Sequence, residues 1–366
     1  MKSHKVQVTV AVVIGLLCLY FFAKDMDWPK VWTAMSEANY GLILLAVLIG
    51  LFSMVIRAFR WQSLLGEPKV TTGKLFLIMS IGFMGNGVFP ARMGELIRPF
   101  LVWRSTPHRF STALATIVVE RVFDLLGILL ILAYVFYTMP FPTATTPIEI
   151  ASLGAAAGKT AMPSDPRLWM QQLSVVGLWI FIALFAVIGT LTYAPDWSLR
   201  AARKLFTPLP LSVSDKLLKM VVSFEKGAST FRRPLSFLYC LFLTLLLWVT
   251  IAVGELVTLW AFHIYSVSFS GSLFLMAGLC FAVMFPQLPG YIGPYQWAVM
   301  LILTRTFSVN ESLSGAVALV MWFSQVPPVI VLGFICLVIL GVSFQEISHV
   351  QEKMPDAAGE ENGVGG

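Results

Sequence analysis

The chain has 366 residues and a formal net charge of +6; 58% of its residues are apolar and only 12% are charged. Soluble domains carry about 25% charged residues, so this composition excludes an ordinary soluble fold. Repeated apolar runs close to the length that spans a bilayer predict an all-α, polytopic integral membrane bundle. The basic residues lie in loops, so no nucleic-acid partner is expected.

The N-terminal part is expected to form two spans, over residues 6–23 and 40–56. The sequence Phe21-Phe22-Ala23 offers no small-x-small cleavage site, so we expect the first run to remain as a helix. Lysine and arginine residues before the first run and after the second favour a multi-pass protein of the inner cell membrane with a cytoplasmic N-terminus.

A third apolar run, residues 75–89, breaks at Gly85-Asn86-Gly87 and Pro90. The chain then either crosses the membrane, which would place Arg104 and Arg109 outside, or returns as a re-entrant hairpin, which leaves both inside. The positive-inside rule favours the hairpin. Irregular backbone at that depth must be surrounded by protein or by water.

Six charged residues lie in or beside the membrane after this break, and we call them the charged cluster: Arg92, Glu95, Arg98, Glu120, Arg121 and Asp124. The first three would share one face if their segment is helical, and the last three lie inside the apolar run 111–139. A charge at mid-bilayer costs about 2.5–3.5 kcal/mol, so the cluster should be paired or face a wet cavity. It either locks two helices as an ion network or frees an arginine to bind a lipid phosphate.

The middle of the chain alternates between loops and spans. Residues 140–172 are polar with little net charge and are expected outside, and residues 173–193 return to the cytoplasm. The loop 196–233 is the most basic stretch and is expected to be cytoplasmic. It is either a topogenic loop or an interfacial helix that docks on anionic headgroups.

The C-terminal part contains spans over 234–262 and 314–342 and, between them, a second apolar run broken at Pro286–Gln296. The two broken segments occupy comparable positions in the two halves of the chain and enter the membrane from opposite sides. This pattern predicts two re-entrant hairpins related as an inverted repeat, with a binding site between them near the membrane midplane. We expect one membrane domain over residues 1–344, followed by a disordered, acidic cytoplasmic tail over 345–366.

The second break is either an anion site made of exposed backbone groups at a helix end or a tight turn with no ligand. Asn86 either satisfies broken backbone or touches the substrate. Nucleotide-binding loops, paired-histidine metal motifs and serine nucleophile elbows are missing, so no enzyme activity, metal or cofactor is expected. The candidate substrate-binding residues are the charged cluster together with Asn86, Pro289, Gly290, Gly293 and Gln296.

Three patterns carry a family resemblance: Asn86-x-x-x-Pro90-x-Arg92-x-Gly94-Glu95-x-x-Arg98, then Glu120-Arg121-x-x-Asp124, then Pro289-Gly290-x-x-Gly293. With them the chain, over residues 6 to 343, resembles the flippase-like family that includes the transmembrane region of lysylphosphatidylglycerol synthase. The resemblance implies movement of polar or glycosylated lipids between leaflets. The family often has glycine at the position of Tyr291 and glutamate at that of Gln296, so an aminoacylated substrate is not implied. The synthetase domain of the bifunctional relatives is absent, so no lysyl transfer is implied.

The expected function is therefore translocation of a polar, anionic or glycosylated lipid across the membrane. The alternative is a non-transporting membrane subunit that scaffolds an enzyme of envelope lipid or polysaccharide synthesis. An intramembrane lipid-modifying enzyme is the third reading. The expected partners are the bilayer, a lipid whose polar headgroup can carry phosphate, and a lipid-modifying enzyme.

Overall fold

The computed structural model describes residues 2–24, 26–66, 70–89, 92–139, 234–283 and 288–350, together with Trp197, Arg200 and Arg203. The expected loop 140–172, the span 173–193, nearly all of the basic loop and residues 351–366 lie outside the described residues. The described part is helical and contains no strand, which confirms the all-α prediction.

The N-terminal half consists of α1 (Lys2–Ala23), α2 (Trp28–Ser36), α3 (Tyr40–Leu65), α4 (Thr72–Val88), α5 (Gly94–Ser105) and α6 (Phe110–Thr138). The C-terminal half consists of α11 (Pro234–Ala261), α12 (Phe269–Ala282), the short 3₁₀ turn η3 (Pro289–Tyr291), α13 (Pro294–Phe307), α14 (Glu311–Leu340) and α15 (Phe344–Ser348).

Polar side chains start the long helices at the expected places. Asn39 accepts hydrogen bonds from the amides at the start of α3, and Asn310 does the same for α14. Thr71 caps α4 and Ser268 caps α12 in the same way. Each cap satisfies amides that have no partner inside the helix. The first helix of each hairpin therefore begins with a hydroxyl cap.

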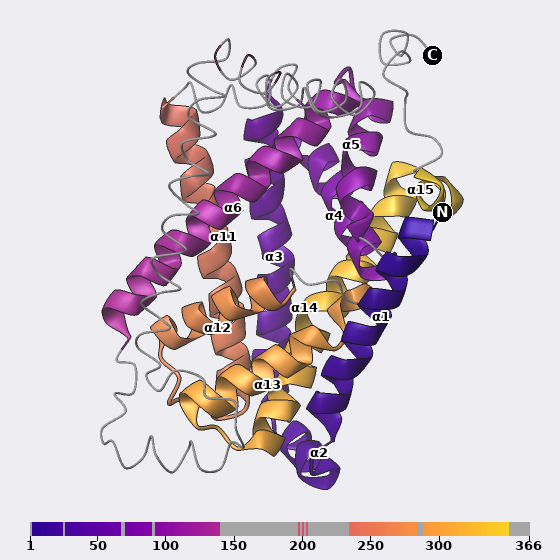
Figure 1. Cartoon of the computed structure of the whole chain (residues 1–366). Helices are drawn as coiled ribbons and strands as arrows, with labels where there is room; N and C mark the ends of the chain where they lie inside the picture. The colour runs from indigo at the N-terminus through magenta and orange to yellow at the C-terminus, as the bar shows by residue number, and fades with distance from the viewer. Residues whose placement is uncertain are drawn as a thin grey trace.

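Helices α4 and α5 form a hairpin whose open end lies at one end of the bundle (Figure 1). The Lys74 ammonium near the start of α4 donates a 2.5 Å hydrogen bond to the Ser105 carbonyl at the end of α5. Helices α12 and α13 form the second hairpin from the opposite end, where Gly271 lies against the Phe307 ring. The chain therefore leaves each hairpin at the end of the bundle where it entered.

The two halves pack on each other in matched pairs. Helices α3 and α11 form the largest contact and run antiparallel, with the Asn39 amide 2.8 Å from the Ala261 carbonyl. The first hairpin packs through α4 on α14, and the second packs through α12 on α6. Each hairpin therefore packs on a long helix from the other half of the chain.

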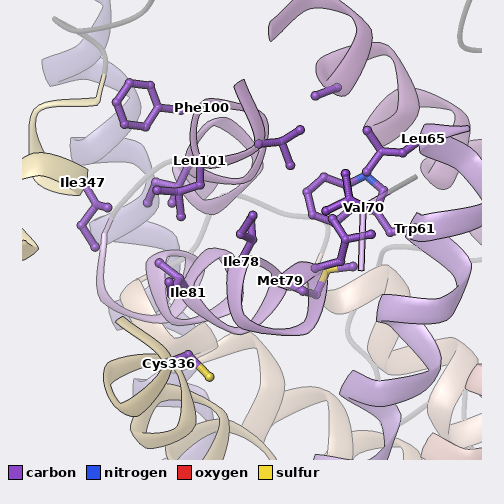
Figure 2. Packing of buried hydrophobic residues seen from close by; sticks show 14 of the residues in the cluster. Trp61, Leu65, Val70, Ile78, Met79, Ile81, Phe100, Leu101, Cys336 and Ile347 are labelled. Carbon is purple, nitrogen blue, oxygen red and sulfur yellow. The ribbon is translucent and has the colours of Figure 1, made fainter. Parts of the chain in front are cut away.

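The larger apolar core lies around the first hairpin (Figure 2). Trp61 from α3, Ile78 from α4 and Leu101 from α5 are fully or almost fully buried there, together with Cys336 from α14. A second core packs α13 against α14, α2 and the end of α11. Each hairpin thus has an apolar core of its own.

Three described helices are long and apolar enough to cross a membrane: Tyr40–Leu65, Leu235–Ala261 and Glu311–Leu340. Helix α6 has 29 residues and a similar mean hydropathy, but it carries three members of the charged cluster, Glu120, Arg121 and Asp124. Many large apolar side chains on the outside of the bundle are exposed, among them Leu48, Phe52, Phe242 and Val338. This exterior suits a lipid environment, and the chain is accordingly treated as a membrane protein.

The structure corrects two expected boundaries. Helix α3 continues to Leu65 instead of ending at residue 56, so Arg57 and Arg60 lie inside the bundle. The tail begins later than residue 345, because Ile347 and Val350 are buried in the first core and Glu346 pairs with Arg104. Apolar residues three apart give α15 a face that can pack, and the polar composition of the tail hides this pattern.

Candidate functional site

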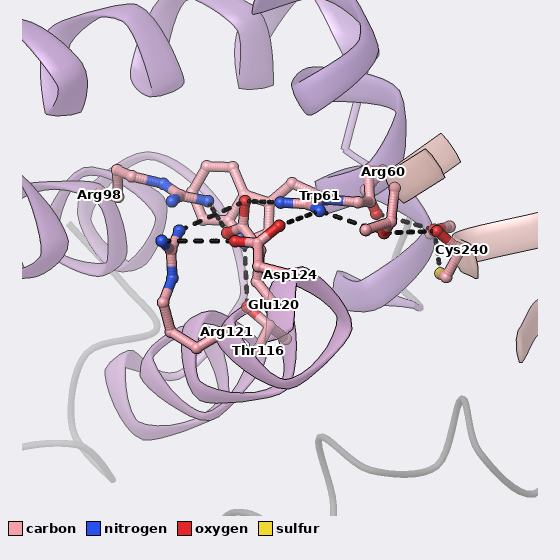
Figure 3. Close-up of polar contacts among 10 residues, drawn as sticks. Arg60, Trp61, Arg98, Thr116, Glu120, Arg121, Asp124 and Cys240 are labelled. Carbon is pink, nitrogen blue, oxygen red and sulfur yellow. Dashed lines mark hydrogen bonds and ion pairs between the residues drawn. The ribbon is translucent and has the colours of Figure 1, made fainter. Parts of the chain in front are cut away.

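Arg60 is the centre of a buried polar network on the inner face of α3 (Figure 3). Its Nη1 donates to Asp124 Oδ1 at 2.5 Å and to Thr244 Oγ1 at 3.1 Å, and its Nη2 donates to Glu120 Oε1 at 2.6 Å. The Arg60 and Glu120 side chains are both 0% exposed. The network thus ties α3 to α6 and α11.

Glu120 extends the network to the first hairpin. Its second oxygen, Oε2, accepts a 2.7 Å bond from Arg98 Nη2 on α5. The Arg98 guanidinium also lies 4.3 Å from the ring centroid of Trp61, which suits a cation–π contact. Because each carboxylate meets a guanidinium in short bonds, Arg98, Glu120 and Asp124 are arranged as a helix lock.

Arg121 lies on the outer side of this network. Its side chain is 45% exposed, and its nearest acidic atoms are Asp124 Oδ2 at 3.4 Å and Glu120 Oε1 at 3.9 Å. These distances are longer than those of the inner bonds. Arg121 is therefore the member of the network that can exchange its carboxylate partners with the smallest loss of interaction energy.

Sequence reasoning missed Arg60, which we took as a residue that follows the second span. Its signal was available: Arg57 and Arg60 are three residues apart in a helix that continues to Leu65, so both face inward. The positive-inside rule assigns such arginines to the cytoplasm, and buried carboxylates on another helix override it here.

Arg92, Glu95 and Asn86 do not join the network. Arg92 precedes α5 in the left-handed conformation (φ +53°), so it does not share a helix face with Arg98 as expected. Its guanidinium instead bonds the carbonyl of Val283, at the end of α12. Glu95 is half-buried and makes no ion pair with any described residue. Asn86 Oδ1 is buried, has no partner in the described chain, and lies against Gly94.

The second break is a compact turn. Gly290 and Gly293 have positive φ angles of +75° and +98°, which glycine adopts at little cost. Gln296 is buried, and its Oε1 accepts a 2.8 Å bond from the Gly293 amide. Pro289 opens η3, and the Gly290 carbonyl accepts a 2.6 Å bond from the Trp322 indole. Gln296 thus stabilises a tight turn, which is one of the two alternatives that the sequence allowed for this break.

The tips of the two hairpins meet in the middle of the molecule, beside a cavity of about 140 Å³. Gly87 comes from the first tip and Tyr291 from the second. The rest of the lining is contributed by α3, α11, α14 and α4: Gly50, Ser53, Met54, Arg57, Phe83, Ile251, Gln325, Val326, Val329 and Ile330. This central cavity lies between the two hairpin tips and the long helices α3, α11 and α14.

The central cavity and the network contain no group of three or more histidine, cysteine or acidic residues that could hold a metal, and none occurs elsewhere in the described residues. Glu255 on α11 is a buried acid outside the network, and its Oε2 has no hydrogen-bond partner in the described chain. The arrangement can bind and orient a polar group.

Comparison with known families gives one match that spans most of the chain. The model of the lysylphosphatidylglycerol synthase TM region matches residues 8–333. The chain belongs to this family. The match covers both hairpins, the whole polar network and the central cavity, so the resemblance carried by the three sequence patterns is confirmed.

A curated relative of this member of the lysylphosphatidylglycerol synthase TM region family is the glycosyltransferase AglD of Haloferax volcanii. The two chains are 28% identical over 132 residues, which is 34% of this chain and 20% of the relative. The chain thus matches only about a fifth of that relative's length. The family match places this chain among membrane proteins.

Proposed function

We propose that this protein moves a polar lipid, anionic or glycosylated, between the leaflets of the inner cell membrane. The observation that carries the proposal is the meeting of two hairpins, entered from opposite ends of the bundle, at one cavity. Discontinuous helices that meet near the midplane are the usual place of the substrate in inverted-repeat transporters.

The arrangement supplies two gates. The first hairpin separates the central cavity from the end that holds Thr72 and Ser105, and the second separates it from the end that holds Phe269 and Phe307. Displacing one tip at a time would expose the cavity to one side only. The acyl chains can remain in the bilayer while the headgroup passes the tips, because the exterior is apolar.

A second candidate is a non-transporting membrane subunit that holds an enzyme of lipid or polysaccharide synthesis. The observation that favours it is the partial match to a relative named as a glycosyltransferase. On this reading the cavity is a packing defect, and filling it would leave the activity of the partner enzyme unchanged.

A flux assay in reconstituted vesicles separates the two. Headgroup-labelled phospholipid and glycolipid are placed in both leaflets, and an impermeant reagent that destroys the outer label reports their exchange. Transport predicts faster exchange of at least one lipid than in protein-free vesicles. Equal rates for every lipid would overturn transport and favour the scaffold.

A matched pair of variants links flux to the cavity. Val329 on α14 lines the cavity, whereas Val331 on the same helix is 56% exposed. Val329→Phe fills the cavity and should abolish most of the flux, whereas Val331→Phe should leave it unchanged. Equal flux in both variants would show that lipid does not pass through the cavity.

A further inference from the structure

Arg57 lies on α3 at the wall of the central cavity and differs from every other arginine near it. Arg60, Arg98 and Arg121 face carboxylates, and Arg92 bonds a carbonyl. Arg57 makes no ion pair or side-chain hydrogen bond with any described residue; its guanidinium lies 4.7 Å from the ring centroid of Phe83. A guanidinium carries five N–H donors, so this side chain lacks an acceptor.

A second donor faces the same cavity. Gln325 on α14 lines it, and the buried Nε2 of Gln325 has no hydrogen-bond partner in the described chain. A buried amide donor without an acceptor costs about 1–3 kcal/mol, so its persistence points to a ligand that supplies one. Arg57 on α3 and Gln325 on α14 therefore offer hydrogen-bond donors to the cavity from two different helices.

Tyr291 completes the polar part of the lining from the tip of the second hairpin. Its φ of +64° is left-handed, a conformation that disfavours residues with a Cβ by roughly 1–2 kcal/mol. Strained residues of this kind gather at ligand sites. Tyr291 thus brings a phenol hydroxyl to the lining of the cavity.

The charges around the cavity favour an anion. In the network, the first break and the cavity wall, Arg57, Arg60, Arg92, Arg98 and Arg121 are five positive charges, against the four carboxyl groups of Glu95, Glu120, Asp124 and Glu255. This leaves an excess of at least one positive charge near the cavity. No carboxylate lines the cavity. In a low-dielectric interior an anion bound there would gain a strong charge-assisted bond.

The cavity is large enough for the anion. A volume of about 140 Å³ holds several water molecules, and a phosphate group fits this space. Apolar side chains form the remaining wall, which suits the glycerol and first carbons of a lipid.

We propose that Arg57 and Gln325 bind the phosphate of the transported lipid, with Tyr291 closing the site from the second hairpin. This rests on the proposed function and names its substrate class: a lipid with a phosphate next to its glycerol or prenyl chain. The planar fork of Arg57 would hold two phosphate oxygens, and Gln325 Nε2 would donate to a third.

The test measures binding to the purified full chain in detergent, by the rise in melting temperature with three probes. These are dioctanoyl phosphatidylglycerol, an uncharged dioctanoyl glycolipid and inorganic phosphate. The phosphatidylglycerol should stabilise the wild type. Arg57→Gln should weaken its binding roughly 10- to 100-fold and Gln325→Leu several-fold, as expected for bonds to a charged group.

Arg305→Gln is the matched control, because this arginine on α13 is exposed and far from the cavity lining. Arg57→Lys keeps the charge and should recover only part of the affinity. Arg57 has no ion pair to break, so without ligand Arg57→Gln loses only the contact with the Phe83 ring and should melt only slightly below the wild type and Arg305→Gln. An unliganded Arg57→Gln variant that melted as low as a variant in which the buried Arg60–Glu120 pair is broken would assign Arg57 a structural role and overturn the proposal.

The probes separate the sources of phosphate. If inorganic phosphate protects the wild type as well as the lipid does, the ligand is free phosphate and the lipid assignment fails. If the glycolipid raises the melting temperature as much as phosphatidylglycerol does, and Arg57→Gln binds both as the wild type does, the phosphate-site proposal is overturned. The proposed lipid transport would not be affected by that result. Absence of flux for every lipid would instead overturn the proposed function.

Discussion

The two hairpins each pack on a long helix of the other half of the chain, but different forces hold them. The first is fastened by buried ions: Arg98 on α5 bonds Glu120 on α6, and Glu120 bonds Arg60 on α3. The second has no such buried ion pair among the described residues: its tip is held by the Gln296 cap, by the Trp322 indole and by the bond from the Arg92 guanidinium to the Val283 carbonyl. Removing one partner of a buried ion pair costs about 3–5 kcal/mol, whereas a neutral hydrogen bond contributes about 1 kcal/mol.

This difference predicts that one hairpin stays fixed while the other moves. The first hairpin should stay fixed to α3 and α6, because its displacement separates buried charges. The second hairpin can release its tip by breaking single hydrogen bonds to neutral acceptors, without separating an ion pair, and it carries Tyr291 at the central cavity. We therefore expect the second hairpin to open first when a lipid enters or leaves.

The largest effect should come from Glu120, the carboxylate shared by Arg60 and Arg98. Glu120→Ala leaves two buried guanidinium groups short of an acceptor and should lower the free energy of unfolding in detergent by about 3–5 kcal/mol. Glu95→Ala is the control, since Glu95 is half-buried on the same hairpin and has no ion pair among the described residues. Equal losses would show that the network does not fasten the hairpin.

The next effect concerns the close approach of α4 and α5. A Cβ on Gly94 would lie 1.8 Å from the Gly82 carbonyl oxygen, a backbone atom that cannot turn aside. Gly94→Ala should therefore cost about 1–3 kcal/mol or more, measured by thermal unfolding.

Two matched variants sharpen this prediction. Gly73→Ala, on α4, meets nothing within 4 Å and should be neutral or slightly stabilising. Gly278→Ala, in the second hairpin, meets only the end of the Ile302 side chain, at 2.5 Å, and should cost less than Gly94→Ala. Equal costs in the two hairpins would contradict their unequal tightness.

Much of the fold follows from the sequence, because apolar runs and glycine or proline breaks are local signals. The breaks near Gly87 and Pro289 and the long runs of α3, α11 and α14 needed no tertiary information. The reach of α3 to Leu65 could not be seen in this way. Arginine inside a span contradicts local hydropathy and is explained only by acids on α6.

The site was predicted less completely for the same reason. Spacing identified Glu120 and Asp124 as facing the interior, but their partner Arg60 comes from 60 residues away. The charged cluster identified from the sequence contains three arginines and three acids, whereas the structure adds the positive charges of Arg57 and Arg60 inside the bundle. The hairpin tips could be paired only once the structure placed Arg92 beside Val283.

The third prediction concerns the tip of the second hairpin. Trp322→Phe removes the 2.6 Å indole bond to the Gly290 carbonyl but keeps an aromatic ring, so stability should fall by only about 1 kcal/mol. Amide exchange over residues 289–296 should accelerate more than exchange over residues 94–105. Trp260→Phe on α11, where the ring is 39% exposed, is the control. Uniform acceleration in both hairpins would argue against independent opening of the second.

The smallest effect should be a pH dependence at the base of the first hairpin. His108 lies in the connection between α5 and α6, outside the helices; its ring is buried, and its Nε2 makes no hydrogen bond in the described chain. Burial lowers the pKa of His108, and the backbone of Leu65 offsets this only in part. The unfolded chain has a histidine pKa of about 6.5.

The sign follows from which state takes up the proton first. Above pH ~6.5 His108 is neutral in both states, and its contribution to stability is fully present. As the pH falls below that value, the unfolded chain is protonated before the folded one, so stability declines until the lower folded pKa is reached. His108→Gln should lose this slope between pH 7.5 and pH 5.5. All other titrating groups are shared by the two proteins and cancel in the difference. Parallel stability curves for both proteins would show that His108 does not titrate in this range. The stability of the connection between α5 and α6 would then not depend on pH through His108.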